Sequence, residues 1–341
     1  MNYSIHTIGL RKELRNLMEY YDTLERLYNN GQGRYRVFPD NKNGDYHATI
    51  FEDRGIRVLL RKTPIGGYMI FILSLNDLIG TDDKLSLIQP ESLQAALDSA
   101  DDMLTGEFGE DYSINNLELY RVDYCINVNI GNPENVREYI KQLYRTDMKK
   151  GYKLTVSDNF DFDVNKGFTA RNMITGTEIS FYDKQKQLEQ RSYDSEQAGG
   201  ILRVELRLLT WKTVAKHTPG CRDNRERVAY CMNSSRQEIL DIVRLILPDG
   251  DYYTIKKACA IVKKSVKKEK LRNRMIEMLR LTRKHSSVRI AKEKLFEKCP
   301  KLRHDYFDKM MVEFERIGVN VVTLEKDSEV KCLPSLFRYL K

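Results

Sequence analysis

Three stretches decide the fold of this chain: GTEISFYDKQKQLEQ at 176–190, ILRVELRLL at 201–209 and ELYRVDYCINVNI at 118–130. In each stretch apolar and polar residues alternate, as they do in a strand with one buried face. Buried parallel strands give continuous apolar runs instead, so the alternation indicates antiparallel pairing. The sequence therefore predicts an α+β fold, with helices on one face of an antiparallel sheet and a polar opposite face.

The polar sides of these stretches carry side chains that could do chemistry. If the three strands are neighbours, seven such residues lie together: Arg121, Asp123, Asn127, Tyr182, Arg203, Glu205 and Arg207. Two adjacent carboxylates such as Asp123 and Glu205 repel each other unless a cation lies between them. Oxygen ligands favour Mg²⁺ or Mn²⁺ in that position. The pattern therefore predicts a divalent metal site on the polar face.

Tyr182 is the candidate nucleophile beside this site. A tyrosine next to a divalent metal can attack phosphorus, because the metal polarises the scissile phosphate. Its ordinary pKa of about 10 means that its proton must be removed or its anion stabilised. Lys184 and Lys186 are the nearby cations for that task or for the phosphate. The alternative interpretation is a water-exposed ladder of cross-strand ion pairs, in which Tyr182 is a packed aromatic.

The rest of the chain supplies the elements around this sheet. The sequence predicts helices over 10–28, 90–109, 132–146 and about 224–247, and strands within 45–51, 55–62, 68–75, 153–163 and 168–174. Three further helices (268–284, 286–298 and 301–317) followed by a hairpin over 319–333 have the order of a winged-helix domain. Another arrangement of the same elements is the open alternative. We expect a catalytic domain over 1–220, which carries the predicted site, and a basic helical domain over 221–341.

Charge is unevenly spread along the chain. Residues 251–341 hold 24 Lys and Arg against 12 Asp and Glu, or +12, whereas residues 1–250 hold 33 against 37, or −4. The basic C-terminal quarter indicates a polyanionic partner, most simply nucleic acid, with a solvated lysine-rich surface as the alternative. Its phosphate contacts are expected at Lys263, Lys264, Lys267 and Lys268. If 286–317 is a helix-turn-helix, Lys301 and Arg303 begin its recognition helix; a protein-docking domain is the alternative.

The sequence lacks the signals of membrane insertion, secretion and structural zinc. No run approaches the ~18 apolar residues of a membrane helix, and the first residues, MNYSIHTIGLRKEL, contain no apolar signal-peptide region. The six cysteines form no CxxC pair, so neither a zinc site nor a disulfide framework is indicated. We therefore expect a cytoplasmic protein without a membrane partner.

Aromatic residues outside the three strands give weaker signals. Trp211 could stack on single-stranded bases, but buried packing is the favoured interpretation. Tyr193 could be a second nucleophile, although its segment shows no strand pattern. We assign neither residue a role in the expected site.

Three motifs resemble those of a known class of protein. RVDYCIN, the Tyr-Asp-Lys of SFYDKQKQLEQ and LRVELRL, in this order and spacing, resemble the rolling-circle replication initiators of bacterial mobile elements. Two branches fit: the filamentous-phage replication endonuclease family with its phage and plasmid relatives, and the replication initiation factor family of Gram-positive plasmids and conjugative transposons. The resemblance covers residues 115–210 and, loosely, the basic helical tail.

This resemblance implies a relative of the HUH endonuclease fold that nicks and rejoins one DNA strand at an origin through a 5′-phosphotyrosine. Tyr182 and Lys184 match the two ends of the Tyr-x-Lys motif. Asp123 matches the acid of Arg-x-Asp, and Glu205 the glutamate of the following strand. The sequence has no His-x-His metal motif. The expected metal ligands are Asp123, Glu205 and Asn127, and Asn127 departs from the second acid that some members carry.

The expected function is to initiate rolling-circle replication of a phage, plasmid or integrated element, as a metal-dependent DNA endonuclease and strand transferase with Mg²⁺ or Mn²⁺. Arg121, Arg203 and Arg207 are expected to contact the DNA beside Tyr182. The expected partners are single-stranded or supercoiled origin DNA, a host helicase and a second copy of the chain. The alternative function is a non-catalytic, sequence-specific DNA-binding protein that retains the initiator fold.

Overall fold

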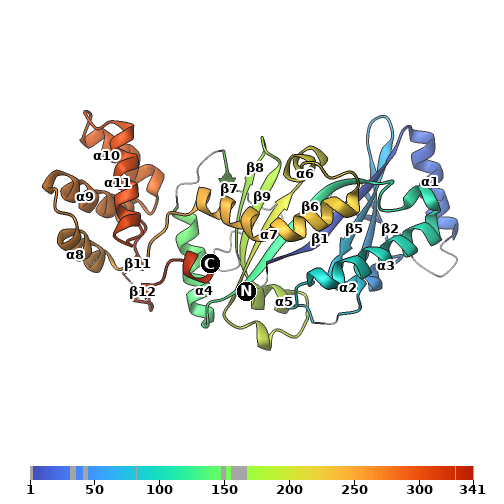
Figure 1. The fold of residues 1–341 in the computed structure, drawn as a ribbon, viewed down its shortest axis with the longest axis horizontal. Helices are drawn as coiled ribbons and strands as arrows, with labels where there is room; N and C mark the ends of the chain where they lie inside the picture. The colour runs from blue at the N-terminus through green and yellow to red at the C-terminus, as the bar shows by residue number, and fades with distance from the viewer. Residues whose placement is uncertain are drawn as a thin grey trace.

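One large antiparallel sheet forms the body of the molecule (Figure 1). The structure is a computed structural model, and it describes residues 3–30, 36–40, 45–81, 83–146, 151–154, 167–326 and 328–340. Ten described strands follow one another across the sheet: β2 (Val37–Asp40), β3 (Asp45–Ala48), β4 (Ile56–Lys62), β5 (Gly67–Ser74), β1 (Ser4–Leu14), β6 (Glu118–Asn129), β10 (Ile201–Leu208), β9 (Thr177–Asp183), β8 (Gly167–Asn172) and β7 (Lys153–Leu154).

The three strands with alternating sequences are neighbours, which is the condition on which the expected site depends. β10 lies between β6 and β9, and both pairings are antiparallel. Arg203 of β10 is therefore opposite Asn127 on one side and Tyr182 on the other. Two positions further on, Glu205 is opposite Ser180 of β9, and Arg207 is opposite Asp123 of β6. This register brings the polar residues of the three strands onto one face.

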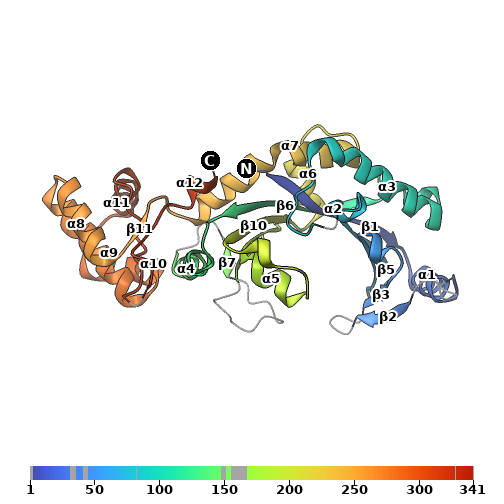
Figure 2. The same cartoon turned by 90° about the horizontal axis from the view of Figure 1, so that it is seen from below.

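The opposite face of the same strands is apolar and fully buried. Val122, Tyr124 and Ile126 of β6 lie beside Val204 and Leu206 of β10, and all five side chains are inaccessible to water. The long helix α7 (Asn224–Ile246) packs on this part of the sheet, against β1, β6 and β10. In Figure 2, α3, α6 and α7 lie along one side of the sheet, and α5 lies on the other. The predicted combination of an antiparallel sheet and flanking helices is confirmed.

The helices of the sheet body are mostly those that the sequence predicts. They are α1 (Leu17–Asn30), α2 (Leu75–Leu78), α3 (Pro90–Phe108), α4 (Pro133–Tyr144), α5 (Lys184–Gln190), α6 (Trp211–His217) and α7, with short 3₁₀ turns at Glu52–Arg54, Glu110–Tyr112 and Glu196–Ala198. Helix α4 begins as expected, because the Asn132 side chain accepts a hydrogen bond from the backbone of Glu134 and Pro133 takes the first helical position.

The N-terminal segment corrects one prediction. Residues 10–14 belong to strand β1, and the helix predicted over 10–28 begins only at Leu17. Strand β1 pairs with β6 through a shift of register between Ile5 and Thr7, so that His6 is the extra residue of a bulge. The bulge breaks the alternation of buried and exposed positions, which explains why the strand was missed. The strand predicted over 153–163 is described only as far as β7, and its remainder lies outside the described residues.

Four helices form a separate unit at one end of the elongated molecule (Figure 1). They are α8 (Ile255–Ser265), α9 (Glu269–His285), α10 (Val288–Lys298) and α11 (His304–Arg316). The chain then returns to the body through β12 (Cys332–Leu333) and α12 (Phe337–Leu340), and the hydroxyl of Tyr3 donates a hydrogen bond to the carbonyl of Leu340. The two ends of the described chain therefore lie side by side.

The hairpin predicted over 319–333 is wrong. Val319 and Leu324 form isolated parallel bridges with Asp251 and Thr254, whereas β12 pairs antiparallel with β11 (Tyr252–Tyr253). Both segments use the short stretch 251–254 as their partner and do not pair with each other in the described residues. The winged-helix arrangement stays a prediction.

Helix α7 lies on the sheet, although the boundary expected between residues 220 and 221 assigned it to the C-terminal domain. Its packing against β1, β6 and β10 makes it part of the sheet body. None of the helices in the described ranges combines the length and the apolar composition needed to cross a bilayer.

Candidate active site

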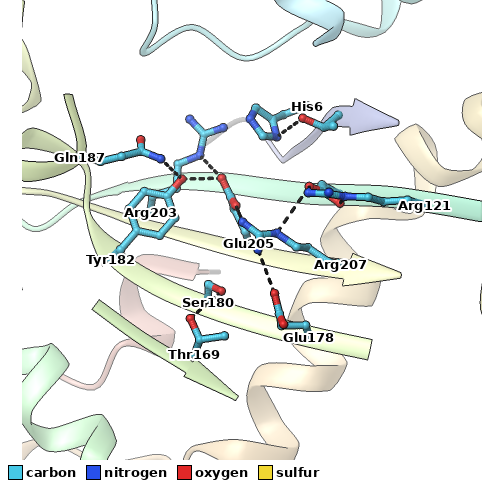
Figure 3. Close-up of polar contacts among 12 residues, drawn as sticks. His6, Arg121, Thr169, Glu178, Ser180, Tyr182, Gln187, Arg203, Glu205 and Arg207 are labelled. Carbon is cyan, nitrogen blue, oxygen red and sulfur yellow. Dashed lines mark hydrogen bonds and ion pairs between the residues drawn. The ribbon is translucent and has the colours of Figure 1, made fainter. Parts of the chain in front are cut away.

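The polar face of β6, β10 and β9 holds a connected cluster of charged side chains around Tyr182 (Figure 3). The hydroxyl of Tyr182 donates a hydrogen bond of 2.5 Å to Oε1 of Glu205. Burial, and then the charge of Glu205, raise the pKa of Tyr182 well above 10. Tyr182 is therefore a neutral phenol in the resting protein, and its proton already points at a carboxylate.

Glu205 is held in place by two arginines. Its Oε1 atom lies 3.3 Å from Nε of Arg203, and its Oε2 atom accepts a hydrogen bond of 2.8 Å from Arg207. Burial works to raise the pKa of Glu205, but its interactions with His6, Arg203 and Arg207 outweigh burial and lower that pKa far below the ordinary value. Glu205 is thus ionised. The Tyr182 hydroxyl donates to this carboxylate, and two arginines orient the carboxylate, which is the arrangement typical of an activated nucleophile.

Arg207 contacts three carboxylates at once. It donates 2.8 Å and 2.9 Å hydrogen bonds to Glu205 and Glu178, and its Nε lies 3.5 Å from Oδ2 of Asp123. These carboxylates raise the pKa of Arg207 despite its burial, so its charge is permanent. Its guanidinium lies between Asp123 and Glu205, the place in which the sequence predicts a metal ion.

The donors present do not fit a divalent metal in this arrangement. Both oxygens of Asp123 accept hydrogen bonds from Arg121, at 2.8 and 2.6 Å, and both oxygens of Glu205 are engaged as well. The side-chain amide of Asn127 donates to the carbonyl of Leu85 at 2.7 Å, and its oxygen lies 3.4 Å from Arg203. Across the described residues, no group of three or more His, Cys, Asp or Glu side chains could hold a metal ion. The Mg²⁺ or Mn²⁺ site stays a prediction from the sequence.

Lys184 reaches Tyr182 through Gln187, a residue that the sequence analysis did not single out. Lys184 donates a 2.8 Å hydrogen bond to the side-chain oxygen of Gln187, and the amide nitrogen of Gln187 donates to the Tyr182 hydroxyl at 3.2 Å. Both residues lie on α5, which begins directly after β9 because Asp183 caps it by accepting from the backbone of Gln185 and Lys186. Burial and the charge of Arg203 lower the pKa of Lys184 to about 8.

His6 is a second residue that the sequence analysis missed. The bulge in β1 carries its ring to the polar face, where Nδ1 lies 3.1 Å from the hydroxyl of Thr7. Burial and the charge of Arg203 lower its pKa to about 4, so the imidazole is neutral at neutral pH. The sequence gives no clear signal for His6, because the polar residues Ser4 and Thr7 lie close to it in the N-terminal segment.

Gly167 leaves room for the nucleophile. It is opposite Tyr182 in the pairing of β8 with β9, and a Cβ atom at this position would lie only 2.9 Å from Cβ of Tyr182. The Tyr144 hydroxyl fixes the same residue by donating a 2.6 Å hydrogen bond to its carbonyl. The position of Tyr182 thus depends on the absence of a side chain from its neighbour.

The remaining predicted residues lie elsewhere. Lys186 faces Asp183, where its charge acts on the capping carboxylate. The exposed basic residues of the C-terminal helical unit are remote from Tyr182 along the chain and belong to the end of the molecule seen apart from the sheet in Figure 1: Lys263, Lys264, Lys267, Lys268, Lys301 and Arg303. Lys301 and Arg303 precede α11, whose first residue is His304.

The comparisons with known proteins find only distant structural likeness. No family model matches the sequence, and no curated protein matches it. A rolling-circle replication initiator protein from Geobacillus stearothermophilus is similar over 72% of this chain and 80% of its own, at 12% identity and a TM-score of 0.30. The di-domain ARO/CYC BexL of the BE-7585A biosynthetic pathway is similar over 70% of this chain and 96% of its own, at 11% identity and a TM-score of 0.23. Neither similarity is strong enough to carry an argument about function.

Proposed function

We propose that this chain nicks and rejoins one strand of DNA, with Tyr182 as the nucleophile, to start rolling-circle replication of a phage, plasmid or integrated element. The observation that carries the proposal is the hydrogen bond from the Tyr182 hydroxyl to Glu205, in a cluster that also holds Arg203 and Arg207. A hydroxyl, a proton acceptor and fixed cations are the parts that phosphoryl transfer to tyrosine requires. The ordered motifs of the sequence support the same function.

The proposed nicking step uses Tyr182 and Glu205. The Tyr182 oxygen forms a bond to the scissile phosphorus, its proton passes to Glu205, and the bond from phosphorus to the 3′ oxygen breaks. The strand is left with a 5′-phosphotyrosine on one side and a free 3′ hydroxyl on the other. Because Glu205 is a weak base and Tyr182 a weak acid in this environment, proton transfer accompanies the attack and does not precede it. Rejoining is the same step in reverse.

Lys184 is the proposed proton donor to the leaving 3′ oxygen. Its lowered pKa of about 8 is close to neutral pH, where a general acid is most effective. Arg203 and Arg207 are the proposed cations that stabilise the charge developing on the phosphate. A divalent metal, if bound during the reaction, would supply the same stabilisation, but the carboxylates predicted to hold one are paired with arginines.

A second candidate function is DNA binding without chemistry. It is favoured by one observation: the three arginines 121, 203 and 207 are matched by three carboxylates, and Tyr182 is not ionised. Such a balanced cluster could serve only to hold the sheet together. In that case the basic C-terminal unit would carry all of the affinity for DNA.

A covalent-adduct assay decides between the two. The purified protein is incubated with labelled single-stranded DNA from the origin of its own element, denatured and separated by electrophoresis. We expect a covalently labelled band that Tyr182→Phe abolishes. Tyr193→Phe is the matched control, since Tyr193 is the exposed tyrosine nearest in sequence and has no contact with Glu205 in the described structure. A band that persists in Tyr182→Phe shows that Tyr182 is not the nucleophile.

A further inference from the structure

A hollow of about 740 Å³ opens at the turn between β8 and β9, away from Tyr182. Its walls are the turn itself at 172–177, the start of α6 and the end of α7. The turn can approach α6 closely because residue 176 is a glycine with a φ of +65°, and a Cβ there would lie 2.7 Å from the hydroxyl of Thr213. The hollow is thus built into the fold by the packing of the turn against α6.

The lining exposes large apolar side chains, against the expectation that Trp211 is buried. Trp211 is 44% exposed, Met173 is 74% exposed and Ile174 is 93% exposed. Exposed apolar side chains that gather on one feature mark binding sites more often than scattered ones do. An accessible indole offers a flat face to another ring.

The charged side chains of the lining are all basic. No Asp or Glu is among the described residues that line the hollow. Arg11 and His217 already contact the carboxylates of Glu118 and Glu238, at 2.5 and 2.8 Å. The two cations left for a ligand are Lys212 and Lys216, both exposed and both on α6 beside Trp211.

We propose that this hollow binds a segment of single-stranded nucleic acid, with a base stacked on Trp211 and phosphates near Lys212 and Lys216. Neither lysine has a carboxylate partner among the described ion pairs, although Nζ of Lys212 lies 5.7 Å from the centre of the Trp211 ring. An exposed aromatic ring beside such cations is the recognition chemistry of single strands. The absence of acidic lining residues favours a polyanion over a protein surface, which would present both signs of charge. The inference rests on the proposed function only in its choice of DNA as the nucleic acid.

The hollow is separate from the proposed reaction site. It is walled by α6 and α7, which lie on the opposite side of the sheet from α5, whereas Tyr182 contacts Gln187 of α5. Contacts at the hollow add affinity without touching the reacting atoms.

Trp211 is the only tryptophan of the chain, so its fluorescence reports on the hollow alone. The experiment titrates the full chain with a 20-nucleotide oligo-dT at low salt and records both Trp fluorescence and the anisotropy of a dye on the DNA. We expect saturable quenching with the same midpoint as the anisotropy change. The double variant Lys212→Gln/Lys216→Gln should raise that midpoint about ten-fold. The control Lys294→Gln/Lys298→Gln changes two lysines outside the hollow that are already paired with Glu297 and Glu277, and it should leave both the midpoint and the quenching at saturation unchanged.

Three outcomes would overturn the proposal. DNA binding by anisotropy with no change in Trp211 fluorescence would place the strand elsewhere. Equal quenching by heparin would mean a polyanion site without base stacking. Fluorescence that depends on protein concentration without DNA, together with a dimer in sedimentation, would mean that a second copy covers the hollow. Tyr182→Phe should leave the quenching unchanged. A covalent adduct without quenching would contradict DNA binding in the hollow but not the nicking. Quenching without a covalent adduct would contradict the nicking but not DNA binding in the hollow.

Discussion

Tyr182 illustrates how one residue can be poised for attack without being reactive at rest. Its phenol is neutral because burial and the adjacent carboxylate both disfavour the anion. The same carboxylate, Glu205, lies in line to accept the proton, and two arginines keep it ionised. Arg203 is buried, but the side chain of Arg207 is 29% exposed. A phosphate brought against Arg207 would weaken its pairing with Glu205 and make that carboxylate a stronger base. Substrate binding therefore activates the nucleophile in this account.

The protonation of Lys184 should determine how the rate of adduct formation falls at alkaline pH. Only the protonated amine can donate to the leaving oxygen, so the rate of adduct formation is expected to fall as pH rises through about 8. Lys184→Arg keeps its charge at high pH, so its rate should stay level to at least pH 10. Lys184→Gln should be slower by about 100-fold at pH 7 and lack this limb. Single-turnover rates of adduct formation between pH 6 and 10 measure this dependence. If the rate of Lys184→Arg still falls above about pH 8, the fall belongs to another group.

Arg207 should be the cation that makes a metal unnecessary for the fold of the site. Arg207→Gln leaves Asp123, Glu178 and Glu205 without their shared partner and should lower the free energy of unfolding by about 3 kcal/mol. We expect 1 mM Mn²⁺ to raise the Tm of this variant and to leave that of the wild type unchanged, because only the variant lacks the cation that lies between Asp123, Glu178 and Glu205. The control is Arg225→Gln, which loses its pairs with Asp98 and Asp101 on the surface. A saturable rise in the Tm of the wild type with Mn²⁺ would contradict the assignment of Arg207 as the cation between these carboxylates.

At the scale of the element, alternation predicted β6, β9 and β10 because a period of two residues is visible in the sequence itself. The partner of each polar side chain on this face could not be predicted, since it depends on the register between strands. The bulge at His6 hid β1 for the same reason. Gln187 gave no signal, because a polar residue on a seven-residue helix is ordinary. The sequence predicts the three arginines of this face as DNA contacts. Their pairing with carboxylates could not be predicted, because it arises only when the strands pack side by side.

Gly167 allows an element-scale test of how strand pairing positions the nucleophile. Gly167→Ala places a Cβ where it meets Cβ of Tyr182 at 2.9 Å, so β8 and β9 must separate slightly and Tyr182 must shift. Adduct formation should fall about 10- to 100-fold, as expected for misplacement of a reacting group. Thr169→Ala is the control: it removes a hydrogen bond to Ser180 in the same strand pair without touching Tyr182. Equal rates in the two variants, at equal Tm, would show that Tyr182 tolerates the shift.

At the scale of the molecule, a sheet body with a net charge of −4 over residues 1–250 is joined to a helical unit within a segment of +12. The uneven charge was readable from the sequence, whereas the return of the chain to the body through α12 was not. That return depends on contacts between distant residues, such as the hydrogen bond from the Tyr139 hydroxyl to the carbonyl of Pro334. The helical unit is thus tethered to the body at both of its ends.

The salt dependence of DNA binding should localise the electrostatic contacts to this unit. Changing Lys263, Lys264, Lys267 and Lys268 to Gln should reduce the slope of log K against log salt by up to about 3, at about 0.7 per phosphate contact with a single strand. The control changes Lys294, Lys298 and Lys309, which are already paired with Glu297, Glu277 and Asp305. Fluorescence anisotropy over a series of salt concentrations measures both. A slope unchanged by the first set would move the phosphate contacts to another surface.

The identity of the residue that carries DNA tests the central claim most directly. The covalent complex formed with origin DNA is digested with nuclease and protease, and the peptide that retains a nucleotide is sequenced by mass spectrometry. The account predicts a single 5′-phosphotyrosine linkage, at Tyr182. A nucleotide on Tyr193 or on any other residue, or no covalent complex under conditions in which the DNA is bound, would contradict it.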